Sequence, residues 1–511
     1  MLKGIRGSSI LFSHEFDKQE SFYLKSDFVN YLYEYCRLGG FYTILSAEIT
    51  TLLIYTSTFI GFLFLTNCIK YDALLELDNN GETESFLEII DFTNITHLDY
   101  PYIILIVLFC LFFLFKIFTI IDQTKIFYKI KYFLQDKIKL RDSELRHLTW
   151  EEIVHKIKEV YNDPQINVYL LSSRITIGDN ILLSMFDKNL IPFTRITNMM
   201  ETSLKFCFIS PFLTNERVIS YDSLENIVEI ENKIRIRLKI LSILQFLFMP
   251  LIVLCSVFYN VVSLAEKIYH NPVGLFRYQW TRYAKWKWRA YNELEDDYNT
   301  RIQSITELGE DYTKQFSNPF VRIFLQFTYH ILNLAFVFFI LISFLNQNSL
   351  LTLVVVGDRS VLWFLGILGS LLSISRSFTT ITVPRKSVRK CMNNILSSIK
   401  YVDDDWITHA HKRTQYNKFL KYFNYKLSIL LYNSLYTLIT PFYLWKLQYE
   451  TENIVYFLRN SFIKHPILGY ISKYAVFEND SFSFNGDAKT VVSLETFKQK
   501  YEKTSILLNI V

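Results

Sequence analysis

Glycine, proline and cysteine are scarce in this chain of 511 residues, which holds 14, 10 and 6 of them. So few glycines and prolines argue against long linkers. The cysteines are scattered and lack C-x-x-C spacing, so the sequence indicates neither a disulfide framework nor a zinc site. A glycine-rich phosphate loop and a nucleophile elbow are also missing from the sequence. We therefore predict no enzyme active site, no cofactor and no metal site.

An excess of charge of one sign is also missing, since the formal net charge is only +5. That value is too small to indicate a nucleic-acid partner, and no nucleic-acid-binding signature occurs. The N-terminus lacks the pattern of a cleavable signal, because the apolar run after Lys3 and Arg6 covers only residues 10–12. We expect insertion into a membrane to use the first spanning helix.

Hydrophobic residues are abundant: they make up 50% of the chain, with 45 Phe and 34 Tyr. Four long tracts contain almost no charge, and each is near the roughly 20 residues that span a hydrocarbon core of ~30 Å. The predicted spans are residues 41–66, 101–121, 321–345 and 359–376. The sequence thus predicts an all-α polytopic membrane protein with four transmembrane helices.

Loop charges predict how these spans are oriented, because short cytoplasmic loops are rich in Lys and Arg. Loop 67–100 has one Lys and many acids, and loop 346–358 has almost no cations, whereas several Arg and Lys follow the fourth span. We therefore place both loops in the lumen and both chain ends in the cytosol. Residues 122–239 then form a cytosolic helical region, in which Thr149 and the acids after it predict a helix start.

Two further apolar tracts, 240–265 and 427–446, contain Pro250 and Pro441. A complete crossing by the first would place the basic stretch after it in the lumen, against the charge rule. A helix that enters, turns near the proline and returns avoids this, and irregular backbone is tolerated at membrane depth when packed against protein. We predict that both tracts are re-entrant, with cytosolic helices at 377–426 and a cytosolic C-terminal region at 447–511.

A basic and aromatic segment lies within residues 266–320, directly after an apolar tract. Aromatic rings prefer the headgroup layer and cations are drawn to anionic lipid, so this pattern predicts a helix lying along a membrane surface. The residues predicted to bind that surface are Arg277, Trp280, Arg282, Lys285, Trp288 and Arg289.

Several local strings, in this order, resemble the autophagy-related protein 9 family. Residues 168–190 are similar to a family helix at Arg174, Asn180 and Lys188, and residues 271–294 resemble the NP-x-x-L...W...FNEL block. Residues 365–378 resemble the last spanning helix and residues 457–460 the F-x-R-N element. The match covers roughly residues 40–475, and the order and spacing of the strings are more specific than any one of them.

The resemblance implies the fold and role of that family. It implies four spanning helices, two re-entrant elements and a domain-swapped homotrimer on vesicles derived from the Golgi or endosomes. It also implies a phospholipid scramblase that acts without an energy source, at the phagophore assembly site, beside a rod-shaped autophagy lipid-transfer protein. Phospholipids and the membrane are then the partners, and autophagosome expansion is the process served.

Scrambling requires a polar path for the headgroup, and ionisable or amide side chains at membrane depth are its signature. Gln326, His330 and Asn333 are spaced to share one helical face, which makes them the best candidate for a groove wall. The six predicted path residues are Glu48, Lys116, Gln326, His330, Asn333 and Arg376.

Other interpretations of these residues stay open. The polar stripe could join helices by hydrogen bonds, Glu48 could pair with a cation near the interface, and Lys116 and Arg376 could extend to the headgroups. At the level of the whole protein, an ion or solute channel or transporter could use the same side chains, although no inverted repeat or ring of acids is apparent. A structural vesicle protein that recruits partners through residues 122–239 is a third possibility.

Overall fold

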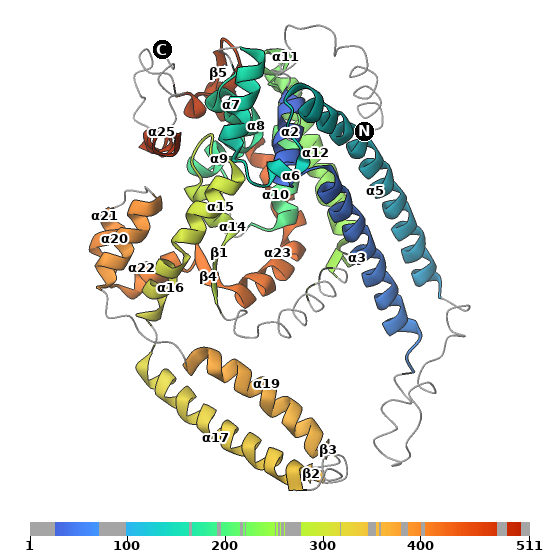
Figure 1. Ribbon diagram of the computed structural model, residues 1–511, viewed down its shortest axis with the longest axis vertical. Coiled ribbons are helices and arrows are strands. Elements are labelled where there is room, and N and C mark those ends of the chain that lie inside the picture. Colours follow the sequence, from blue (N-terminus) through green and yellow to red (C-terminus); the bar gives the residue numbers. More distant parts are fainter. Residues whose placement is uncertain are drawn as a thin grey trace. The chain divides into compact units, whose positions relative to one another are not determined.

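The computed structural model divides the chain into two compact units (Figure 1). The residues described are 26–70, 99–162, 166–191, 196–214, 218–219, 221–250, 252–253, 256, 260, 277–316, 318–345, 354–356, 359–379, 387–399, 404–477 and 488–501. Most of the predicted lumenal loops, and residues 261–276 of the basic and aromatic region, lie outside the described residues. Helices dominate both units, as the sequence predicts.

The first unit contains Met1–Ile177 with the short stretches Leu213–Ser220 and Lys464–Tyr470. Its helices are α2 (Ser26–Arg37), α3 (Phe41–Asn67), α5 (Tyr100–Tyr132), η3 (Phe133–Lys137), α6 (Asp142–Leu145), α7 (Trp150–Tyr161) and α8 (Val168–Ile175). Figure 1 shows α3 and α5 side by side as a long helical pair. These two helices contain the first two predicted spans, and each is long and apolar enough to cross a membrane.

A tight turn joins α2 to α3. Gly39 and Gly40 adopt positive φ angles of 78° and 100°, which glycine tolerates at no steric cost. A Cβ on Gly40 would stand 2.8 Å from the Asp142 side chain, so the turn also needs glycine for space. The Asp142 carboxylate accepts hydrogen bonds from the Tyr35 hydroxyl at 2.7 Å and the Phe41 amide at 3.2 Å. One carboxylate thus fixes the angle at which α3 leaves the N-terminal helix.

The predicted helix start at Thr149 is confirmed. The Thr149 hydroxyl accepts from the Glu152 amide, and the Glu152 carboxylate accepts from the Thr149 amide. This reciprocal capping box satisfies two donors that the first turn of α7 would otherwise leave unpaired.

The second unit contains Gly178–Phe212, Tyr221–Ile463 and Ile471–Val511. Its helices up to the third predicted span are α9 (Ile177–Asp187), α10 (Asn198–Leu204), η4 (Lys205–Ile209), α11 (Tyr221–Glu225), α12 (Ile227–Leu247), α14 (Arg282–Trp288), α15 (Glu295–Ser304), α16 (Thr306–Lys314) and α17 (Pro319–Leu345). The later helices are α19 (Val361–Thr379), α20 (Val388–Ile399), α21 (Asp404–Thr408), α22 (Arg413–Phe419), α23 (Lys426–Leu447), η6 (Gln448–Glu450), α24 (Thr451–Ser461), η7 (Lys473–Ala475) and α25 (Ala488–Tyr501).

Strands are few and short, and all pair in twos. They are β1 (Tyr278–Trp280) with β4 (Phe423–Tyr425), β2 (Val354–Val356) with β3 (Arg359–Ser360), and β5 (Phe462–His465) with β6 (Gly469–Ser472). The β1–β4 pair is antiparallel, with Trp280 opposite Phe423. Beside it, buried side chains of α14, α15, α16, α20 and α22 form one hydrophobic core.

The third and fourth predicted spans form a helical hairpin, α17 and α19, joined through β2 and β3 (Figure 1). Within the described residues, four helices are long and apolar enough to cross a membrane: Phe41–Asn67, Tyr100–Lys137, Pro319–Phe344 and Lys426–Ser461. The predicted fourth span is instead a shorter apolar helix, Val361–Ser373. The described residues therefore contain four long apolar helices, the number predicted. The fourth of these helices, however, contains the tract 427–446, which we predicted to be re-entrant.

The predicted turn at Pro441 is wrong, because α23 runs unbroken from Lys426 to Leu447 with this proline inside it. Proline removes one helix donor, but neighbouring groups can satisfy the freed backbone. The carbonyl freed by Pro441 is that of Thr437, and the nearby hydroxyls bond to other carbonyls. Thr437 and Thr440 donate to carbonyls one turn back, at 2.7 and 2.8 Å, and the Ser242 hydroxyl of α12 donates to the Pro441 carbonyl at 2.7 Å. Helix α23 is thus continuous at Pro441, where α12 packs against it.

The first tract predicted to be re-entrant begins inside α12, which starts at Ile227 rather than at Ile240. Helix α12 ends at Leu247, and helical structure resumes at Met249 and Pro250, with the Ile252 amide donating to the Phe248 carbonyl at 2.9 Å. Proline is tolerated in the first turn of a helix, where its missing N–H is not needed. Further along, Asn260 donates to the Ser434 hydroxyl of α23 at 2.7 Å. Whether the chain returns to its original side after Pro250 stays a prediction.

Candidate functional site

Glu48 and Lys116 come together between α3 and α5. The Lys116 Nζ lies 3.4 Å from Glu48 Oε2, and the two side chains are 28% and 32% exposed. The expectation that Glu48 pairs with a cation is therefore confirmed, and the cation is Lys116. The two residues are 68 positions apart in the sequence, so no local sequence pattern could reveal that they pair.

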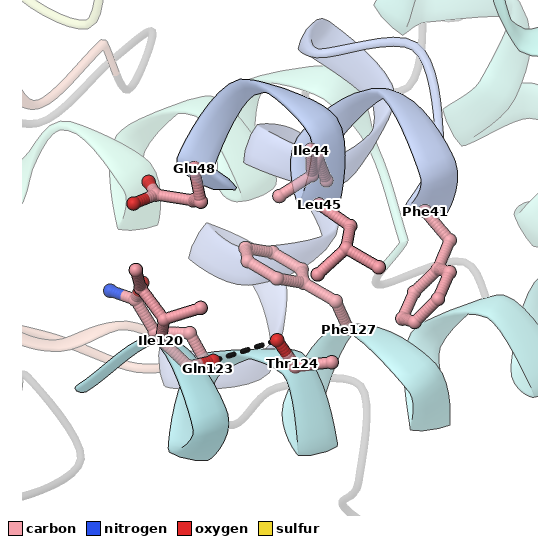
Figure 2. Close-up of a pocket in the computed structure, with 8 residues that line it drawn as sticks. All are labelled: Phe41, Ile44, Leu45, Glu48, Ile120, Gln123, Thr124 and Phe127. Atoms are coloured by element: carbon pink, nitrogen blue, oxygen red, sulfur yellow. Dashed lines mark hydrogen bonds between the residues drawn. The ribbon is translucent and has the colours of Figure 1, made fainter. Parts of the chain in front are cut away.

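A small cavity lies beside Glu48, between the same two helices (Figure 2). Its walls are formed by Phe41, Ile44, Leu45, Glu48, Ile120, Gln123, Thr124 and Phe127. Its volume of about 10 Å³ is at the lower limit for a single water molecule. Figure 2 shows the Glu48 carboxylate and the Gln123 side chain at one end and the Phe41 ring at the other. The cavity thus has a polar end and an aromatic end.

Gln326, His330 and Asn333 lie along one exposed face of α17. Contact with α19 uses a different face, since Phe336 lies next to Gly369 and the Phe339 ring stacks on Phe364 at 6.1 Å. Within the described chain, no hydrogen bond holds any of the three polar side chains. The three residues therefore form a polar stripe on one face of α17, and this face is not the one that contacts α19. Arg376 lies in the last turn of α19 with its side chain exposed.

The basic and aromatic segment is folded into the second unit, so the prediction of one surface helix is wrong. Its described part consists of β1, the seven-residue helix α14, a turn, α15 and α16. Trp288 and Arg289 are only 5% and 3% exposed. Side chains this deep have no face left for lipid.

The other members of the predicted surface set also have protein partners. Arg282 contacts the Glu201 carboxylate at 2.9 Å, Lys285 contacts Glu295 at 2.6 Å, and the Trp280 indole donates to Thr306 at 3.0 Å. Glu201 lies 81 residues before Arg282, so no window of sequence shows that pair, whereas Glu295 follows Lys285 by only ten residues. Membrane-surface binding stays a prediction for Arg277, which is exposed.

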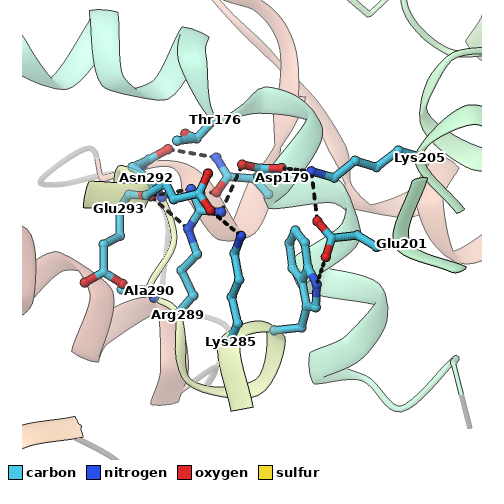
Figure 3. A network of polar contacts seen from close by, with 12 residues as sticks. Thr176, Asp179, Glu201, Lys205, Lys285, Arg289, Ala290, Asn292 and Glu293 are labelled. Atoms are coloured by element: carbon cyan, nitrogen blue, oxygen red, sulfur yellow. Dashed lines mark hydrogen bonds and ion pairs between the residues drawn. The ribbon is translucent and has the colours of Figure 1, made fainter. Parts of the chain in front are cut away.

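A network of charges joins α9, α10, η4 and α14, in which Arg289 and Glu201 are buried and Asp179 and Lys205 are partly exposed (Figure 3). The Asp179 carboxylate lies 2.9 Å from Arg289 Nη1 and 3.0 Å from Lys205 Nζ. Lys205 also contacts Glu201, at 3.4 Å, and Glu201 accepts from the Trp286 indole at 3.3 Å. The remaining Arg289 nitrogens donate to the Glu293 carbonyl at 3.0 and 2.8 Å. Each buried charge therefore has an opposite charge, which buried ions require.

The pKa of Asp179 follows from this network. Burial by itself raises the pKa, but the nearby charges of Arg289 and Lys205 outweigh it and hold the pKa below its ordinary value. For Arg289, burial lowers the pKa and the carboxylates of Asp179 and Glu293 more than restore it. Both groups are therefore charged at neutral pH.

We expect a pH-dependent contribution of Asp179 to stability. Because its folded pKa is lowered, the contribution is complete above the ordinary value of about 3.9 and is lost as the pH falls further toward the folded value. At neutral pH, Asp179→Asn should lose about 2 kcal/mol, between the values for exposed and buried ion pairs. Thermal unfolding of both proteins in detergent between pH 7 and pH 3 measures this. A difference in apparent Tm that does not shrink below pH 4 would contradict the assignment.

Two motifs that carry the family resemblance meet in the second unit. Asn180 donates to the Asn292 side chain at 2.9 Å and accepts from the Asn292 amide at 3.1 Å. Asn292 adopts φ 57°, a left-handed conformation that asparagine tolerates. Next to it, Glu293 accepts from Arg301 at 2.8 Å. The spacing of the two motifs in the sequence could not reveal this contact. Asp179, Glu201 and Arg301 were not among the predicted functional residues.

Long apolar helices, an ion pair between the first two of them and a polar stripe on the third define a multi-pass α-helical membrane protein. A family model, described as Autophagy protein ATG9, matches residues 26–478. The chain belongs to this family of autophagy proteins.

Named relatives agree with this assignment. Autophagy-related protein 9 of Eremothecium gossypii is 25% identical over 481 residues, which cover 89% of this chain and 53% of that protein. The protein of the same name from Schizosaccharomyces pombe is 23% identical over 454 residues, covering 82% and 63%. The chain thus spans little more than half the length of these relatives. A cryo-EM structure of Schizosaccharomyces pombe Atg9 matches 88% of this chain with a TM-score of 0.65 at 19% identity, which establishes the shared fold.

Proposed function

We propose that this chain is a lipid scramblase, which lets phospholipids pass between the two leaflets of a membrane without an energy source or covalent chemistry. In a family of autophagy proteins, this activity would supply lipid to both leaflets of a growing autophagosome. The observation that carries the proposal is the α17 stripe of Gln326, His330 and Asn333, exposed on the face away from α19.

The cost of burying polar groups is the physical argument. Charged side chains at mid-helix cost about 2.5 to 3.5 kcal/mol on insertion scales, and polar side chains at membrane depth therefore mark a pathway or a partner. Gln326, His330 and Asn333 lie next to one another on one face and have no hydrogen-bond partners within the described chain. They therefore need water, a headgroup or another protein chain beside them. A groove that carries headgroups supplies both water and headgroups.

Replacing Gln326, His330 and Asn333 together with leucine tests the proposal. We expect lipid exchange to fall about tenfold or more, because the headgroup then loses several modest polar contacts along its path. Purified protein is reconstituted in liposomes with fluorescent lipid, and dithionite reports how much label reaches the outer leaflet. The matched control is Thr328→Val with Ser343→Ala in the same helix. In the described part of the chain these hydroxyls bond only to carbonyls four residues earlier in α17, at 2.9 and 2.7 Å.

The possible results separate the alternatives. Undiminished exchange by a leucine variant that elutes like the unmodified protein would show that the stripe only packs helices. Ion flux without lipid exchange in the unmodified protein would favour a channel. Absence of both would favour a structural vesicle protein that recruits autophagy partners.

The proposal extends to assembly and location. A homotrimer on Golgi- or endosome-derived vesicles at the phagophore assembly site, with both termini in the cytosol and a lipid-transfer protein as partner, agrees with membership of the family. A second copy of the chain could also cover part of the exposed apolar surface of α12, where Ile236 and Leu247 are 56% and 68% exposed.

A further inference from the structure

We infer that Glu48 and Lys116 form a binding site for zwitterionic phospholipid headgroups, with Glu48 facing the ammonium group and Lys116 facing the phosphate. The inference rests on the lipid movement proposed above and adds a substrate class to it. Neither charge lies at the end of a helix: Glu48 is seven residues from the start of α3, which is about 10 Å along its axis. Because about 20 of the 27 residues of α3 fill the hydrocarbon core, the pair lies near the edge of that core.

The Glu48–Lys116 contact is looser than the ion pairs of the folded second unit. Arg289 and Asp179 are 2.9 Å apart, and Arg301 and Glu293 are 2.8 Å apart with further bonds between them. Glu48 and Lys116 are 3.4 Å apart, and Glu48 Oε2, although buried, has no hydrogen-bond partner among the described residues. This oxygen faces the Lys116 ammonium group but makes no well-aligned hydrogen bond to it, so the pair would gain from an added donor.

The surroundings of Glu48 fit an ammonium group. The Phe127 ring lines the same small cavity as Glu48, and aromatic faces attract ammonium cations, above all quaternary ones. The cavity, of about 10 Å³, is too small for an ammonium group, which would instead approach the exposed part of the Glu48 side chain. On the other side of the pair, Lys116 is a mobile point charge of the kind that binds phosphate.

Charge balance then gives selectivity. A zwitterionic headgroup replaces one ion pair with two, Lys116 to phosphate and Glu48 to ammonium, so that no charge is left unpaired. An anionic headgroup without an ammonium group, such as that of phosphatidylglycerol, takes Lys116 away from Glu48 and offers the carboxylate nothing in return. The site should therefore favour phosphatidylcholine and phosphatidylethanolamine over phosphatidylglycerol.

The test compares the exchange of acyl-labelled phosphatidylcholine and phosphatidylglycerol in the same proteoliposomes, assayed with dithionite. We expect the unmodified chain to exchange phosphatidylcholine faster, and Glu48→Gln to lower the ratio of the two rates about fivefold, the effect that one polar contact has in a membrane protein. Glu48→Asp keeps the charge and should restore most of the ratio. The matched control is Thr51→Val in the same helix, since among the described residues the Thr51 hydroxyl bonds to the Ala47 carbonyl alone, at 2.8 Å.

The failures of the two proposals differ. Equal rates for the two lipids in the unmodified chain, or a ratio that Glu48→Gln leaves unchanged while exchange continues, would overturn the headgroup site and leave the scramblase proposal standing. An equal slowing of both lipids by Glu48→Gln would show that the pair only joins α3 to α5, and would also overturn the site. No exchange of either lipid by the unmodified chain would overturn the proposed function itself.

Discussion

Replacing Arg289 with methionine is expected to destabilise the second unit by about 3 kcal/mol, because it leaves buried partners without their charge. Arg289 is 3% exposed and joins Asp179 to the Glu293 carbonyl through three nitrogens. Methionine fills much of the space but donates no hydrogen bond. For a unit of about 320 residues, with an unfolding entropy of about 2.1 cal/mol/K per residue, the loss corresponds to a fall in apparent Tm of about 4 to 5 °C. Thermal unfolding in detergent, followed by tryptophan fluorescence, measures it.

The matched control is Arg235→Met. Arg235 also contacts an acid, Glu231 in the preceding turn of α12, but its side chain is 46% exposed. Exposed pairs of this kind contribute about 0.3 to 0.5 kcal/mol, so the control should shift the apparent Tm very little. Equal shifts in the two variants would mean that water reaches Arg289, and would contradict its assignment as a buried charge.

Trp286→Ala is expected to have a comparable or larger effect, a loss of about 3 to 5 kcal/mol, because it empties the volume of a wholly buried ring. Trp286 is 0% exposed, stacks on Phe186 with ring centres 5.9 Å apart, and lies 5.2 Å beneath the Lys205 ammonium. Its indole also donates to Glu201. The cavity and the unpaired carboxylate oxygen both lower stability. Apparent Tm and the fraction of protein that elutes as a single species are the measurements.

Two variants separate packing from the hydrogen bond. Trp286→Phe keeps an aromatic ring but loses the N–H, and should cost about 1 to 2 kcal/mol. Trp445→Ala removes a ring that is 39% exposed and should have a smaller effect than Trp286→Ala. If Trp286→Ala and Trp445→Ala behaved alike in detergent, the basic and aromatic segment would not be packed as described.

Local signals in the sequence predicted much of the secondary structure. The apolar tract at 41–66 became α3, and Thr149 with Glu152 became a capping box, because hydrophobic length and helix capping depend on neighbouring residues. The signals failed at Pro441, where a local rule predicted a break. Helix α12 packs on α23 there, and its Ser242 hydroxyl donates to the Pro441 carbonyl from 199 residues away, a contact that no window of sequence contains.

The candidate functional residues were likewise predicted only in part. The spacing of Gln326, His330 and Asn333 placed them on one face of a helix, which the structure confirms, since helical periodicity fixes such neighbours. The basic residues before Glu293 appeared as a surface for lipid because their acids, Asp179 and Glu201, are 110 and 81 residues away from Arg289 and Arg282.

The sequence by itself determined that this chain is helical, that it has helices long enough to cross a membrane and that polar groups lie within them. Each of these depends on composition and on a period of a few residues. Only the tertiary structure decided which charges neutralise one another: Lys116 pairs with Glu48 and Arg289 with Asp179. Electrostatic pairing depends on distance in space, and folding brings together side chains that are far apart in the sequence.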